Sequence, residues 1–110
     1  MNVILKDVRK TIELSLPSFP ESKVVLYDGL LFGQMKKIGD IKGGDMDRGV
    51  MVLQYLIKEW NFTNEKGEAL PVNEGNLNQF PIKDLQILME KANTILENIS
   101  KKKVESSKKL

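Results

Sequence analysis

Acids and glycines gather over residues 40–49, a segment with three aspartates and three glycines. An EF-hand loop needs acids at alternating positions and a glutamate at the twelfth place, and that spacing is absent. A phosphate-binding P-loop needs Lys-Ser or Lys-Thr after its glycines, and neither follows Gly43-Gly44. We therefore interpret the segment as a hinge that leads into a helix, with Asp45 as the N-cap.

Side chains for catalysis are few. The chain has no histidine and no cysteine, which excludes imidazole bases, thiolate nucleophiles, disulfides and the commonest zinc ligands. Serines lack an activating base in a folded setting. The carboxylates that remain for acid–base work fall in a polar connection: Glu59, Glu65, Glu68 and Glu74. We predict a protein that is not an enzyme, with no catalytic residue, no metal site and no cofactor.

Composition and charge indicate one soluble domain. The 110 residues are 41% hydrophobic and 29% charged. The net charge is +2, but residues 101–110 hold five lysines against one glutamate, a local charge of +4, so residues 1–100 carry −2. We predict a single domain over 1–100 and a disordered basic tail over 101–110. Without a clustered positive face, the body argues against nucleic acid as a partner, although the tail offers weak phosphate contacts.

The start of the chain has no targeting pattern. Lys6 and Asp7 interrupt the apolar run Val3-Ile4-Leu5, which is too short for a secretory signal or a membrane helix. We expect a cytoplasmic protein with no membrane partner.

The first half of the chain predicts strands. Residues 11–16 alternate so that Ile12, Leu14 and Leu16 share one face. A turn with two prolines follows, and residues 23–27 are rich in β-branched and aromatic side chains, which indicates an antiparallel hairpin. Residues 30–32 and 35–38 are expected to add a third and a fourth strand.

The second half has helical periodicity. An apolar stripe that begins at Met46 and ends at Trp60 predicts an amphipathic helix over about 46–61, with Trp60 in the core. A stripe from Leu85 to Ile99 predicts another over about 81–99, and a short helical turn is expected over 74–79. The expected fold is α+β, with a small N-terminal antiparallel sheet packed against two amphipathic helices.

The first of these helices has a second apolar face. Met51 and Tyr55 lie opposite the core stripe, and Phe62 follows the same line if the helix extends that far. Methionine and aromatic residues are enriched in protein interfaces. We predict that this face binds a protein, either a second copy in a homo-oligomer or a different chain. The alternative is that the face packs under the sheet.

Residues 60–85 carry a more specific pattern. It comprises Trp60-Asn61, an acidic turn closed by Gly67, Leu70-Pro71, a short helix capped by Asn73, and Phe80-Pro81 before the last helix. The pattern resembles that of phage and prophage tail assembly chaperones, loosely from Ile12 to Leu96 and with specificity over 57–85. Four positions depart from the residues common in that family: Asn64, Asn73, Gly75 and Phe80.

The resemblance implies a non-enzymatic protein in the cytoplasm of a bacterial host. Such a protein keeps a long tape measure protein soluble while tail tube subunits assemble around it, so the expected partner is a tape measure or tail tube protein. Within the pattern, the expected contact residues are Phe62, Leu70 and Val72. Two other classes stay open: a small structural component of a phage tail or head, and a small regulatory or nucleic-acid-binding module.

Overall fold

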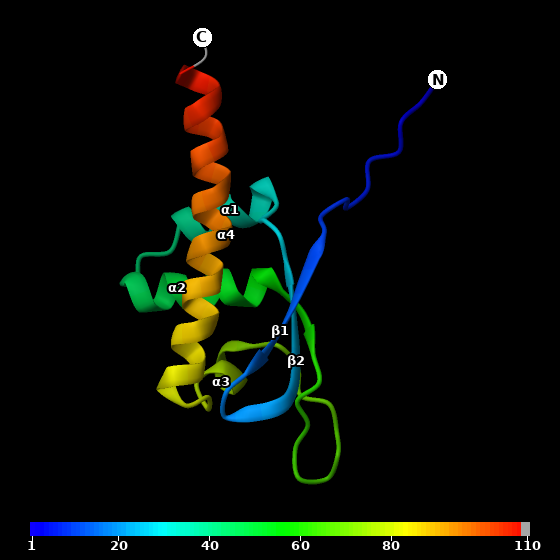
Figure 1. Ribbon diagram of the computed structural model, residues 1–110, viewed down its shortest axis with the longest axis vertical. Helices are drawn as coiled ribbons and strands as arrows, with labels where there is room; N and C mark the ends of the chain where they lie inside the picture. Colours follow the sequence, from blue (N-terminus) through cyan, green and yellow to red (C-terminus); the bar gives the residue numbers. More distant parts are fainter. Residues whose placement is uncertain (109–110) are drawn as a thin grey trace.

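A computed structural model describes residues 1–108, and their side chains as far as Glu97. Seven elements follow one another along the chain (Figure 1). They are β1 (Thr11–Leu16), β2 (Phe19–Tyr27), α1 (Phe32–Gly39), α2 (Asp45–Leu56), β3 (Ile57–Trp60), α3 (Glu74–Leu77) and α4 (Ile82–Lys108).

The three strands form one antiparallel sheet in the order β1-β2-β3. Ile12 pairs with Leu26 and Leu14 pairs with Val24, so the predicted alternation in residues 11–16 is confirmed. These apolar pairs share the face that is turned toward the helices, while Glu13 and Ser15 are exposed. The α+β fold and the presence of an N-terminal hairpin are therefore as the sequence predicts, but β2 begins at Phe19, so the wide turn expected before residue 23 is a tight one.

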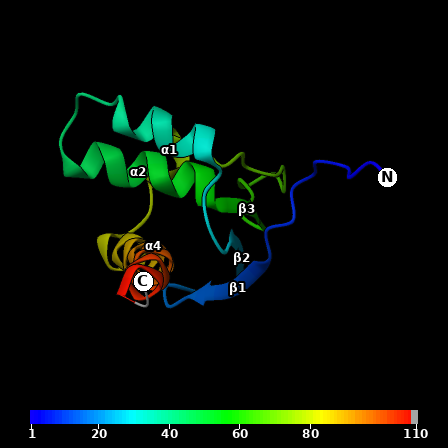
Figure 2. The same ribbon diagram turned by 90° about the horizontal axis from the view of Figure 1, so that it is seen from above.

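The prediction of further strands over residues 30–38 is wrong, because residues 32–39 form helix α1. High helix propensity is common to the four residues Gln34, Met35, Lys36 and Lys37. The short apolar runs beside them suggested strands, and this propensity outweighs them. The Gln34 side chain accepts a hydrogen bond from the Leu31 backbone N–H at 3.0 Å and so closes the first turn. Helix α1 lies alongside α2 (Figure 2).

The helix predicted over 46–61 ends at Leu56, and the chain passes directly into strand β3. Val24 pairs with Trp60 and Val25 pairs with Glu59, so pairing with β2 determines the backbone conformation there. The helix begins after Gly44, which is the N-cap in place of Asp45. The predicted helical turn over 74–79 is confirmed as α3.

The core lies between the sheet, α2 and α4. Helix α2 contributes Leu53 and Leu56, and α3 contributes Leu77, none of them exposed. Where the two long helices cross, a Cβ atom on Gly49 would lie 2.7 Å from the terminal carbon of Met89. The core positions of the sheet and of α4 are Leu16, Val24, Leu26, Ile57, Leu88, Ala92 and Ile95.

Helix α4 begins one residue after Pro81, as the sequence predicts, and its helical backbone continues past residue 99 to Lys108. The predicted basic tail, residues 101–110, lies within this extension and beyond it. Residues 109–110 and the side chains from Asn98 onward lie outside the described residues. The division into a domain and a disordered tail stays a prediction.

Candidate protein-binding surface

Four aromatic rings from distant parts of the chain form a cluster at one end of the sheet. They belong to Phe19, Trp60, Phe62 and Phe80, and are called the aromatic cluster below. Phe62 is central. Its ring centroid lies 5.2 Å from Phe19, 5.4 Å from Trp60 and 5.1 Å from Phe80. The first two contacts are edge-to-face, an arrangement that aromatic pairs favour.

Each ring is positioned by the end of a regular element. Phe19 begins β2, Trp60 ends β3, and Phe80 precedes α4. Phe62 is held by its neighbour Asn61, whose side chain accepts a hydrogen bond from the Lys23 N–H at 2.7 Å and donates one to the Glu21 carbonyl at 3.1 Å. The cluster is therefore built on the rigid sheet.

The loop over residues 61–70 extends beyond the end of the sheet (Figure 1). Its base is closed by the Trp60 indole N–H, which donates to the Leu70 carbonyl at 2.7 Å, and by a bridge between Thr63 and Ala69. Gly67 turns the chain with φ of 81°, in the left-handed region that glycine adopts without strain. The acidic turn of the sequence pattern thus fixes the position of Phe62.

Beside the cluster, the surface is hollowed over about 620 Å³. The wall on one side is the start of β2, residues 18–22, and on the other the chain after β3, residues 61–63. Phe19 is 37% exposed at this hollow. The surface therefore offers aromatic area with polar groups at its rim, which is the composition of a protein interface.

No family model, curated protein or solved structure matches this chain.

Two of the five predicted contact residues, Phe62 and Leu70, lie at or next to the aromatic cluster. Phe62 is its centre, the Leu70 carbonyl accepts the Trp60 indole bond, and Val72 packs against the core. All three are half-buried. Their role in binding stays a prediction.

Met51 and Tyr55 lie on α2 and are also half-buried. The expected continuous face from Met51 through Tyr55 to Phe62 does not form, because α2 ends at Leu56 and Phe62 follows a strand. Trp60 likewise does not close a helical stripe. It is half-buried in the aromatic cluster at the end of β3, where it contacts Phe62 and Phe80.

Asp84 anchors the β1–β2 turn to the start of α4. Its side chain is fully buried, and Oδ1 accepts a hydrogen bond from the Ser18 N–H at 3.1 Å, while Oδ2 has no partner. Burial acts to raise the pKa of Asp84, but hydrogen bonds from Ser18 and the nearby charge of Lys83 lower it further, so its pKa lies below the ordinary value. This carboxylate thereby holds Phe19 near Phe80.

Sequence reasoning did not assign Phe19, Phe80 or Asp84 to the site, although Phe80 lies within the pattern of residues 60–85. Phe19 stands in a turn and Phe80 precedes a proline, so neither belongs to a periodic stripe. The one signal in the sequence was that aromatic residues stand near both ends of the pattern of residues 60–85.

The described residues include neither a cluster of metal ligands nor a membrane-spanning helix. Among the side chains that the structure describes, no group of three carboxylates could hold a metal ion. Of the described helices, none combines the length and apolar character needed to cross a membrane.

Proposed function

We propose that this protein binds another protein through the aromatic cluster and the hollow beside it, as a non-enzymatic tail assembly chaperone of a phage or prophage. Its partner is a tape measure protein in the cytoplasm of the bacterial host. The observation that carries the proposal is the position of Phe62, at the centre of four rings and at the rim of an open hollow.

The sequence resemblance supports the same surface. Trp60 and Gly67 match the pattern of residues 57–85, and they either form the aromatic cluster or shape the loop that carries Phe62. A rigid aromatic surface suits transient binding of apolar helix segments, because aromatic side chains supply large contact area at low conformational cost.

The first experiment is co-expression with a tape measure protein, the partner that the proposal names. Thr63→Glu places a charge at the rim of the hollow without removing a ring. Phe19→Ser removes the most exposed ring of the aromatic cluster. We expect each variant to weaken binding about tenfold or more, since interface anchors contribute about 2 kcal/mol. Phe32→Ser, at an exposed phenylalanine on α1, is the matched control and retains binding.

Equal recovery of the tape measure protein with all three variants would rule out this surface. Binding that falls steeply with salt would instead favour a nucleic-acid-binding module, because phosphate contacts release counterions. Thermal unfolding of each variant verifies that the fold is intact.

A separate variant tests the predicted contacts on α2. Met51→Ser with Tyr55→Ser changes two half-buried side chains outside the aromatic cluster. If this face also contacts the partner, the double variant retains its fold and loses affinity. Loss of folding would show that the face is part of the packing between helices.

A further inference from the structure

Residues 1–8, called the N-terminal arm below, form an extended segment that runs away from the body in line with β1 (Figures 1 and 2). Its apolar side chains are largely in solvent. Val3 is 94% exposed, Ile4 82%, Leu5 100% and Val8 77%. A run of exposed apolar side chains marks a surface that another molecule covers.

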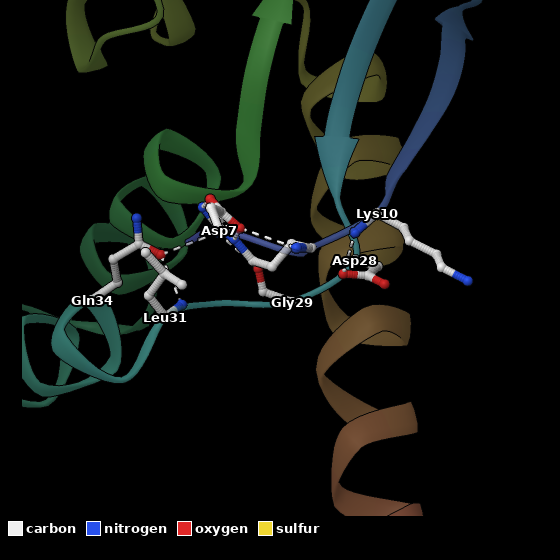
Figure 3. A network of polar contacts seen from close by, with 7 residues as sticks. Asp7, Lys10, Asp28, Gly29, Leu31 and Gln34 are labelled. Atoms are coloured by element: carbon white, nitrogen blue, oxygen red, sulfur yellow. Dashed lines mark hydrogen bonds and ion pairs between the residues drawn. The ribbon is translucent and has the colours of Figure 1, made fainter. Parts of the chain in front are cut away.

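The base of the arm is fixed by Arg9 (Figure 3). Its guanidinium lies 3.6 Å from the centre of the Tyr27 ring, pairs with Asp7 at 2.7 Å, and donates to the Gly29 carbonyl at 3.1 Å. A further bond at 3.4 Å reaches Gln34 on α1. Hydrogen bonds from Arg9 lower the pKa of Asp7 to about 2, so this pair is ionised at neutral pH.

The next residue is fixed as well. The Lys10 N–H donates to the Asp28 carboxylate at 3.2 Å, and the Asp28 N–H donates to the Lys10 carbonyl at 2.9 Å. Residues 9 and 10 therefore continue the line of β1 and make no turn. The arm is directed away from its own sheet, so it cannot fold back along its own β1.

A receiving site lies at the free edge of β1. A hollow of about 370 Å³, called the β1–α4 groove below, separates this strand from α4. Ile12 and Leu14 pack against the core here but stay half-buried, whereas Leu16 is 1% exposed. The core is thus only partly covered along the groove. Its lining residues are Ile12, Glu13, Leu14, Ser15, Ile87, Glu90, Lys91 and Thr94.

The arm and the groove match in length and charge. Strand β1 has six residues, and arm residues 3–8 extend over the same distance, about 20 Å at 3.3 Å per residue. The groove carries two acids, Glu13 and Glu90, beside Lys91. The arm carries Lys6, and its one acid, Asp7, is already paired with Arg9. The free charge of the arm is therefore opposite to the net charge of the groove.

We propose that the arm of one copy adds as an antiparallel strand to the free edge of β1 in a second copy, within the β1–α4 groove. The exchange is reciprocal. When the two β1 strands run antiparallel about a two-fold axis, each arm reaches the partner's groove with the Arg9 contacts unchanged. The two sheets then join into one, with backbone hydrogen bonds and apolar side chains both contributing.

The first test is the oligomeric state of the full chain, measured by light scattering over a series of concentrations. We expect a dimer that Val3→Glu with Leu5→Glu weakens at least tenfold, because these two side chains share one face of an extended strand, are exposed in the single copy and are buried in the exchange. Ile82→Glu, which alters an exposed apolar residue on α4 away from the groove, is the control and dimerises normally. A chain that is monomeric at every concentration overturns the proposal, and so does a dimer that the arm variant leaves unchanged.

Charge reversal tests where the arm docks. Lys6→Glu should weaken the dimer, and adding Glu13→Lys to the same chain should restore it, because Lys6 lies on the opposite face of the arm from Leu5, the face on which β1 exposes Glu13. If the double variant is no tighter than Lys6→Glu alone, the arm does not dock in this groove.

Crosslinking gives a direct readout, since the chain has no cysteine of its own. Copies with Leu5→Cys are mixed with copies with Thr94→Cys and oxidised. A disulfide between the two kinds of chain supports the exchange, and disulfides confined to the Leu5→Cys copies overturn it. Phe19→Ser leaves the dimer intact, so this proposal is independent of the proposed function.

Discussion

Trp60 offers a quantitative test of how the aromatic cluster is held together. Trp60→Ala removes the indole hydrogen bond to Leu70, worth about 1 kcal/mol, and two ring contacts worth about 1 kcal/mol each. The sum of about 3 kcal/mol is at the low end of the range for truncating a buried aromatic side chain, which suits a half-buried residue. Trp60→Phe retains a ring and loses the hydrogen bond, so we expect a loss of about 1 kcal/mol.

Urea unfolding followed by far-ultraviolet circular dichroism measures both variants. Fluorescence cannot be used, because Trp60 is the only tryptophan. We expect the midpoint of Trp60→Ala to fall by about 1–3 M for a slope of about 1–3 kcal/mol/M. Phe32→Ala, at an exposed ring, should change stability by less than about 0.5 kcal/mol.

Two results would refute this reasoning. If Trp60→Ala loses less than about 1 kcal/mol, the ring contacts do not stabilise the fold. If Trp60→Phe is as unstable as Trp60→Ala, the hydrogen bond to Leu70 accounts for the whole effect and the packing of the rings contributes nothing.

Four further substitutions test single contacts. Gly67→Val forces a β-branched residue into the left-handed region and should cost about 1–2 kcal/mol in thermal unfolding, with a smaller loss for Gly67→Asn. Asn73→Ala removes the α3 cap that accepts from the Asn76 N–H at 2.9 Å, and should cost about 1 kcal/mol. Gly49→Val should cost about 1–3 kcal/mol through its clash with Met89, and Met89→Ala in the same chain should recover part of that loss. Because the pKa of Asp84 is lowered in the folded chain, its ionised form stabilises the fold above the ordinary carboxyl range, and this contribution is lost as the pH falls through the lowered pKa. Asp84→Asn should therefore flatten the acid side of the stability curve, and an unchanged slope would contradict the assignment.

The sequence predicted the elements whose periodicity is undisturbed. Ile12, Leu14 and Leu16 alternate without interruption, and the stripe that begins at Leu85 fits a helix alone. The boundary between α2 and β3 could not be found in the same way. Ile57 and Trp60 continue the helical spacing of Leu53, yet they also fit a strand, and only their pairing with β2 decides between the two.

The sequence alone predicted only part of the candidate site. Phe62 lies within the recognised pattern, and the structure places it at the centre of the aromatic cluster. Phe19 and Phe80 come from segments far apart in the sequence, and tertiary packing alone brings them to the same ring. The spacing of residues along the sequence does not reveal a contact of this kind.

The order of the elements along the chain has a consequence for synthesis. The β1–β2 hairpin is complete at Tyr27, but its core face stays open until Leu88, Ala92 and Ile95 of α4 have been made. Since β3 also comes after two helices, a nascent chain carries an uncovered apolar hairpin through most of its translation. The core of the domain is therefore completed late in translation. Messages truncated before the codon for Ile95 would yield chains prone to aggregation and proteolysis.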